Sequence, residues 1–147
     1  MTNSWYQLVS AETKITQGDL VMNCPVLEWS GALDGEVGSN TLKQLAEGVA
    51  ADVIVMTQAC DLAQCKVENL IVCAHYALSE YKTMWEAAMS EKKQNPTSKA
   101  WKNYCDDICD GYVWNLSMLD SRETASIRME RRVVDFHRVY SLPLVQQ

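Results

Sequence analysis

Two apolar runs of strand length, separated by a polar segment, constrain this chain more than any other feature of its sequence. Residues 52–57 and 70–75 read DVIVMT and LIVCAH, and the segment between them reads QACDLAQCKVEN. Neither run alternates in the way a half-exposed strand does, so both faces of each are expected to be buried. The sequence therefore predicts two central strands that form a hairpin across a long polar loop.

The remaining elements follow from turn residues and hydrophobic spacing. Gly18 and Asp19 predict a turn before a strand over 20–29, in which Pro25 favours an edge position. The stretch LKQLAEGVA (42–50) has helical spacing and predicts a short helix that ends at Gly48. Ser79 is expected to cap a first amphipathic helix, and a second is expected over 98–110 with Gly111 at its end. Strand patterns return in 112–119 and 125–142.

This order predicts an α+β domain over residues 1–147. We expect a small antiparallel β-barrel with strands at about 15–29, 52–76 and 111–140, and with a helical hairpin inserted at about 79–110. The last strand is expected to be interrupted near Asp135 and to end at Pro143.

The composition excludes several classes of protein. The chain has 147 residues, is 48% hydrophobic and 22% charged, and carries a formal net charge of -6. An acidic chain repels phosphate backbones, which disfavours nucleic acid as a partner. The sequence has neither an apolar run long enough for a membrane helix nor a signal-peptide pattern, so we expect a cytoplasmic protein without a membrane partner. In that reducing compartment the six cysteines are expected to be thiols or metal ligands.

Metal binding and nucleophilic catalysis are alternatives that the thiols leave open. Zinc ligands could come from Cys60, Cys65, Cys73 and His75, or from Cys105 and Cys109 at helical spacing. The tight C-x2-C spacing of structural zinc sites is absent, however, and Cys73 suits a buried strand. A Cys60 nucleophile has no protease-like motif around it. The sequence therefore predicts no metal, no cofactor and no catalytic residue.

A polar cluster is expected where the first central strand meets the last strand. Its candidate residues are Thr57, Gln58, Cys60, Asp61, His137 and Arg138. Polar groups at the end of a buried strand need internal partners, so this cluster would be either a structural lock or a working site.

A first resemblance concerns the fold. The segments GDLV (18–21) and VIVMT (53–57) resemble the opening of the MazF/PemK toxin barrel, with Gly18, Asp19 and Thr57 matching. The resemblance implies an SH3-like barrel. Such toxins carry an Arg-Pro pair just before the second strand, where this chain has Ala51 and Asp52, so the expected catalytic arginine is missing.

A second resemblance concerns function. The segments TQACDLAQCKVENLIVCA (57–74) and VVDFHRVYSLPL (133–144) are similar to small prokaryotic proteins found near signalling and defence genes. They resemble the small accessory proteins of CRISPR systems that pair an RNA-guided effector with a caspase-like protease. The resemblance implies a protein-binding accessory subunit in antiviral signalling.

The helical segment offers residues for such binding, because aromatic side chains are favoured interface anchors and Met adapts to partner surfaces. The candidates are Tyr81, Met84, Trp85, Trp101 and Tyr104. We therefore expect a non-enzymatic subunit that binds a protein encoded nearby. The alternative is a MazF-like ribonuclease or a zinc-dependent enzyme that uses residues 57–61 with His137 and Arg138.

Overall fold

The chain divides into two compact units. The structure, a computed structural model, describes residues 6–30, 38, 43 and 45–144. The first unit contains the residues up to Ile15 together with His75–Arg138, and the second contains Thr16–Ala74 together with the residues from Val139 onward. Strands β3 and β7 each contribute residues to both units.

Five strands form one sheet in the order β1-β2-β3-β7-β4. Their bounds are Leu20–Trp29 for β1, Ala46–Val55 for β2, Asn69–Ala77 for β3, Leu116–Leu119 for β4 and Arg132–Pro143 for β7. The β1–β2, β2–β3 and β4–β7 pairs are antiparallel. The sheet is not closed, since β1 and β4 lie at its edges. A second, two-stranded sheet consists of β5 (Arg122–Glu123) and β6 (Arg128–Met129).

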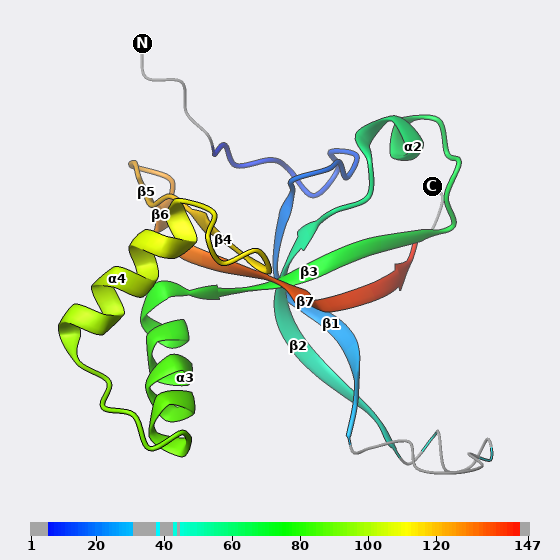
Figure 1. Ribbon diagram of the computed structural model, residues 1–147. Coiled ribbons are helices and arrows are strands. Elements are labelled where there is room, and N and C mark those ends of the chain that lie inside the picture. The colour runs from blue at the N-terminus through cyan, green and yellow to red at the C-terminus, as the bar shows by residue number, and fades with distance from the viewer. Residues whose placement is uncertain (1–5, 31–37, 39–42, 44, 145–147) are drawn as a thin grey trace. The chain divides into compact units, whose positions relative to one another are not determined.

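The second unit is built on β1, β2 and the first part of β3 (Figure 1). Gly18, with φ of 89°, makes the turn before β1, and its N–H donates to the Val55 carbonyl at 2.9 Å. The Val55 N–H donates in turn to the Asp19 carbonyl at 2.9 Å. A bulge bends β1 at Asn23, which has φ of 52° and donates its N–H to the Asp52 carboxylate at 2.9 Å.

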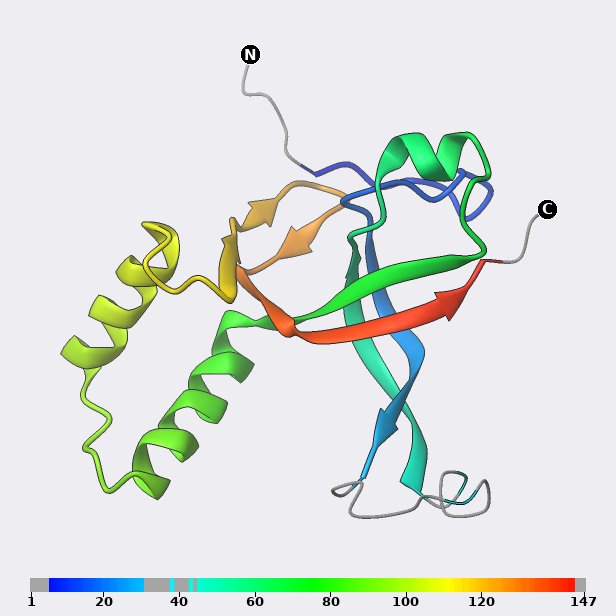
Figure 2. The same cartoon turned by 45° about the vertical axis from the view of Figure 1, so that its right-hand side comes forward.

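The first unit carries a hairpin of two helices that lie side by side (Figures 1 and 2). Strand β3 runs directly into α3 (Leu78–Glu91), and a short turn leads to α4 (Ser98–Cys109). The Thr97 hydroxyl caps α4 by accepting the Ala100 N–H at 3.2 Å. Gly111, with φ of 79°, follows the last turn of α4 in the left-handed conformation that such a terminus requires.

The core of this unit joins α4 to β4 and β7. Ile108, Leu116 and Val133 are buried together. Half-buried side chains pack around them, namely Leu78, Tyr81, Tyr104, Val113 and Met118. Because Tyr81 and Tyr104 come from different helices, this packing also fixes the two helices against each other. Among the helices of the described residues, none is long and apolar enough to cross a membrane.

Several sequence predictions agree with these elements. The strand expected over 20–29 is β1, and the two central runs form the antiparallel β2–β3 hairpin. The helices expected within 79–110 are α3 and α4. The long polar loop between the central strands also contains a short helix, α2 (Ala59–Ala63), which the sequence analysis did not predict.

Other predictions are wrong. Lys43 and Leu45 are helical, as expected, but Ala46–Ala50 belong to β2 instead of continuing that helix to Gly48; residues 42 and 44 lie outside the described residues. Pairing with β1 outweighs the helical spacing there. Strand β7 continues through Asp135 without a break, and the interruption lies before it, between β6 and β7.

Two further corrections concern the first unit. Tyr112 and Trp114 do not alternate within a strand; they precede β4 and are each 78% exposed. Ser79 is not the cap of α3, because the helix begins at Leu78 and Ala77 occupies the capping position.

Candidate functional site

The helical hairpin gathers the aromatic residues that the sequence singled out. The Trp85 ring lies 5.1 Å from the Trp101 ring and 5.9 Å from the Tyr104 ring, between ring centroids. Trp101 and Tyr104 are 6.2 Å apart in turn. Because Trp85 belongs to α3 and the other two belong to α4, this trio holds the helices together and leaves its outer edges half-buried.

Beside this trio lies an open groove with a volume of about 650 Å³, here called the hairpin groove. Its lining residues are Tyr81, Met84, Trp85, Ala88, Met89, Lys92, Ala100, Asn103, Tyr104, Asp107, Asp135 and Arg138. Ala88 and Ala100 have the smallest side chains among these lining residues. Four of the five predicted partner-binding residues line it, and the fifth, Trp101, contacts Trp85.

The groove combines an apolar wall with charges of both signs. Lys92 comes from the end of α3, while Asp135 and Arg138 come from β7. Burial raises the pKa of Tyr81 well above its usual value, and a hydrogen bond with Tyr104 raises it further. The Tyr81 phenol is therefore neutral at physiological pH and acts as a fixed polar group in the wall.

Residues 57–61 act mainly on the loop that carries them. The Thr57 hydroxyl accepts the Ile71 N–H at 2.7 Å, which ties the end of β2 to β3. The Cys60 thiol lies 3.6 Å from the Gln58 side-chain oxygen and 3.8 Å from an Asp61 carboxylate oxygen, and donates toward them. Thr57, Gln58, Cys60 and Asp61 thus close the β2–β3 connection.

His137 and Arg138 belong to the other unit. The His137 N–H donates to the Asp135 carboxylate at 2.9 Å, and its ring stands edge-on to Trp114 at 4.8 Å between centroids. Arg138 lines the hairpin groove. A joint cluster of Asp61 with these residues stays a prediction, because its two halves lie in different units.

The thiols differ in their exposure. All six cysteines are free: Cys24 and Cys73 are buried, Cys105 is half-buried, and Cys60, Cys65 and Cys109 are exposed. Burial raises the pKa of the Cys105 thiol, and neighbouring Cys109 and Asp106 add to the effect. Within the described part of the chain, no three His, Cys, Asp or Glu side chains gather as a metal site would require.

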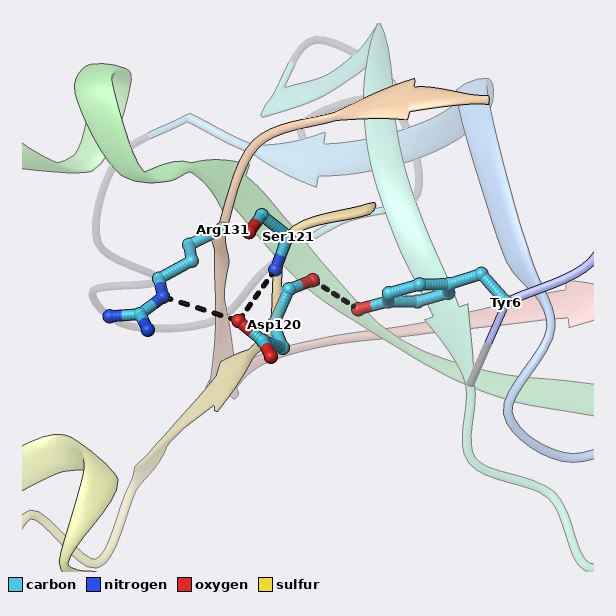
Figure 3. A network of polar contacts seen from close by, with 4 residues as sticks. All are labelled: Tyr6, Asp120, Ser121 and Arg131. Atoms are coloured by element: carbon cyan, nitrogen blue, oxygen red, sulfur yellow. Dashed lines mark hydrogen bonds and ion pairs between the residues drawn. The ribbon is translucent and has the colours of Figure 1, made fainter. Parts of the chain in front are cut away.

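Two polar arrangements were missed by the sequence analysis. The Arg132 Nε donates to the His75 Nδ1 at 2.6 Å, in the buried interior of the first unit. In the second arrangement, shown in Figure 3, the Tyr6 hydroxyl donates to the Asp120 carbonyl at 2.9 Å, and Arg131 approaches the Asp120 carboxylate at 3.3 Å. This network ties the N-terminal segment to the end of β4. Neither arrangement has a local sequence signal, because each joins residues from separate segments of the chain.

Comparisons with known proteins add no relative. No protein-family model, no curated protein and no solved structure matches this chain.

Proposed function

We propose that this protein is a non-enzymatic accessory subunit that binds a protein partner through the hairpin groove. The observation that carries the proposal is the convergence of Tyr81, Met84, Trp85 and Tyr104 on one open groove. Buried Trp and Tyr side chains provide much of the binding energy at protein interfaces. Here they are already held in place by ring contacts within the hairpin, so little side-chain freedom is lost on binding.

The shape of the groove favours an apolar side chain as the anchor of the partner. Small Ala88 and Ala100 line it together with the larger apolar side chains of Met84, Trp85 and Met89. Lys92 and Asp107 supply charges at the rim, which would orient the partner more than hold it. A folded helix or a short peptide segment with one large apolar residue has the matching chemistry.

The biological setting of the proposal comes from the sequence motifs at residues 57–74 and 133–144. Their resemblance to accessory proteins of CRISPR–caspase systems supports a cytoplasmic role in prokaryotic antiviral defence, with the partner encoded by a neighbouring gene. The GDLV and VIVMT segments support the finer proposal that the open antiparallel sheet is related to SH3-like barrels.

A pair of neighbouring alanines tests the groove. Ala88 lines it, whereas Ala87 is exposed on α3 and does not. Ala88→Arg fills the groove with a long charged chain, and Ala87→Arg makes the same change outside it; Arg keeps high helix propensity in both. We expect Ala88→Arg to weaken binding of the neighbour-encoded protein at least about tenfold in isothermal titration calorimetry, and Ala87→Arg to leave it unchanged.

Two outcomes contradict the proposal. One is that the purified chain does not bind the product of any neighbouring gene. The other is that both arginine variants bind with the affinity of the unaltered chain, which would place the interface elsewhere.

A further inference from the structure

The outer part of the β1–β2 pair is a two-stranded ribbon with an open edge. Cys24–Trp29 of β1 pair with Ala46–Ala51 of β2, while the pairing of β2 with β3 covers Val53–Val55. We call this part the outer ribbon. Strand β1 is an edge strand of the sheet. Two-stranded ribbons are only marginally stable in water, and an edge strand with free backbone groups is a template for a further strand.

The two faces of the outer ribbon differ in their exposure: one is buried and the other faces solvent. On one face Cys24 and Val26 are buried, and the Glu28 carboxylate accepts the Tyr140 hydroxyl at 2.6 Å. The residues between them face the other way, and Leu27 and Trp29 are 63% and 57% exposed. Their cross-strand partners share that face. These pairs are Pro25 with Ala50, Leu27 with Gly48, and Trp29 with Ala46.

The exposed face is therefore entirely apolar, with large side chains on β1 and small ones on β2. Single exposed apolar residues are common on protein surfaces, but a contiguous apolar strip along an open edge marks an interaction site. The small residues of β2 offer nothing for an added strand to pack against, whereas Leu27 and Trp29 do. The edge of β1 is thus the better docking position.

The register shows which backbone groups of β1 are available. The Ser30 N–H donates to the Leu45 carbonyl at 2.7 Å, so this directly opposed pair is hydrogen-bonded. Hydrogen-bonded pairs alternate with non-hydrogen-bonded ones along an antiparallel ladder. The N–H and C=O groups of Leu27 and Trp29 therefore point away from β2, as does the carbonyl of Pro25. Proline fits this position because its missing N–H is not needed by β2.

We propose that β1 is a self-association edge, to which β1 of a second copy of this chain adds in antiparallel direction about a two-fold axis at Leu27. In this register the two Leu27 residues exchange both N–H···O bonds of a hydrogen-bonded pair. Each Trp29 N–H reaches the Pro25 carbonyl of the other chain, and each indole ring lies against the opposite proline ring. Because proline has no N–H, every backbone N–H in these pairs has an acceptor in the other copy.

The edge of β1 is self-complementary, which identifies a second copy of this chain as the molecule that binds there. A two-fold interface requires that every group meet its own counterpart or a matching one, and the sequence Pro-Val-Leu-Glu-Trp satisfies this about its central leucine. On the opposite face Glu28 meets Val26, and its carboxylate is already engaged by Tyr140. The outer ribbon lies in the second unit and the hairpin groove in the first, so the inference is independent of the proposed function.

Sedimentation of the full chain over a range of concentrations tests the association. We expect a monomer–dimer equilibrium for the unaltered chain, and a dimer dissociation constant at least about tenfold higher for Leu27→Lys, because two ammonium groups would oppose each other at the axis. Ile71→Lys is the matched control, since Ile71 is an exposed strand residue of the same unit outside the outer ribbon. A monomer at every concentration overturns the proposal, and so does an equal loss of dimer in both variants.

Disulfide trapping tests the register even if Leu27→Lys fails to fold. The background carries serine at the exposed thiol positions Cys60, Cys65 and Cys109. With oxidised glutathione as the electron acceptor, Leu27→Cys is expected to cross-link to its own copy, since the Cα atoms of a hydrogen-bonded antiparallel pair lie about 5.5 Å apart, within the range that a disulfide spans. Pro25→Cys and Trp29→Cys are expected to cross-link only when mixed. Cross-linking of Pro25→Cys alone at the same rate as the mixture overturns the register.

Discussion

The buried contact between Arg132 and His75 is the most demanding single interaction in the first unit. The residues are 6% and 1% exposed, and the Arg132 Nε lies 2.6 Å from the His75 Nδ1. A guanidinium can only donate, so Nδ1 accepts and carries no proton. A buried cation is costly unless it is hydrogen-bonded. The pair thus joins β3 to the start of β7 at a position where either residue alone would be unfavourable.

Arg132→Met keeps much of the apolar bulk of the side chain and removes this donor. We expect it to destabilise the chain by about 1.5–3 kcal/mol, the range for hydrogen bonds that involve a charged group. Arg128→Met is the control, because Arg128 is 88% exposed in its ion pair with Glu123 and is expected to contribute less than about 1 kcal/mol. Urea unfolding followed by Trp fluorescence measures both, and equal midpoints would contradict the role assigned to Arg132.

At the scale of single residues, sequence reasoning singled out aromatic residues that line the groove but not this buried pair. The spacing of Tyr81 and Trp85 is local, so one helical repeat is enough to place them on one stripe of α3, and Trp101 and Tyr104 share a stripe of α4 in the same way. The partner of His75, in contrast, lies 57 residues away along the chain. Nothing in the apolar run LIVCAH shows that its histidine has a buried arginine beside it. Such contacts depend on strand pairing, which a single sequence does not specify.

At the scale of elements, the start of α3 shows a cap supplied from outside the helix. The capping residue Ala77 has no side chain that could accept a hydrogen bond. Instead the Glu130 carboxylate accepts the Ser79 N–H at 3.2 Å and the Ser79 hydroxyl at 2.9 Å, while the Arg131 carbonyl accepts the Leu78 N–H at 2.8 Å. A carboxylate at a helix N-terminus also interacts favourably with the helix dipole.

Removal of this carboxylate is expected to weaken α3. Glu130→Ala should lower the free energy of unfolding by about 0.5–2 kcal/mol, as the loss of an N-cap does. The matched change Glu123→Ala removes only an exposed ion pair with Arg128 and should cost less than about 1 kcal/mol. Thermal unfolding followed by circular dichroism at 222 nm compares them, and a smaller effect for Glu130 than for Glu123 would rule out the cap.

Element prediction succeeded where local pattern and tertiary environment agree. The run 20–29 is bounded by a Gly-Asp turn, and the helices 78–91 and 98–109 are followed by the capping residues Lys92 and Asp110, close to the expected stop signals. It failed at Ala46–Ala50, where a helical pattern is overridden by pairing with β1. It also failed at Tyr112 and Trp114, which precede β4, since the strand and its pairing with β7 begin only at Leu116.

For the whole molecule, the sequence predicted the class of fold better than its closure. The order of strands and helices identified a mostly antiparallel sheet with a helical hairpin, as observed. A barrel requires in addition that the first and last strands of the sheet meet, and β1 and β4 remain its edges. Closure depends on strand tilt and register, which hydropathy does not encode.

The stability of the whole chain at alkaline pH should depend on Tyr81. Burial, then the hydrogen bond with Tyr104, raise its pKa above the ordinary value of 10.0. Below about pH 10 the phenol is neutral in both the folded and the unfolded chain, so its contribution to stability is fully present. As the pH rises further, the unfolded chain loses this proton first, and the contribution is lost toward the higher folded pKa. Unfolding by urea should therefore become easier as the pH rises above about 10. Tyr81→Phe removes this titrating proton, so its free energy of unfolding should fall less with rising pH. Tyr112→Phe removes the phenol of an exposed tyrosine and keeps Tyr81, so it is the control and should show the full fall. Parallel losses in the two variants would show that burial of the Tyr81 phenol does not control this pH dependence.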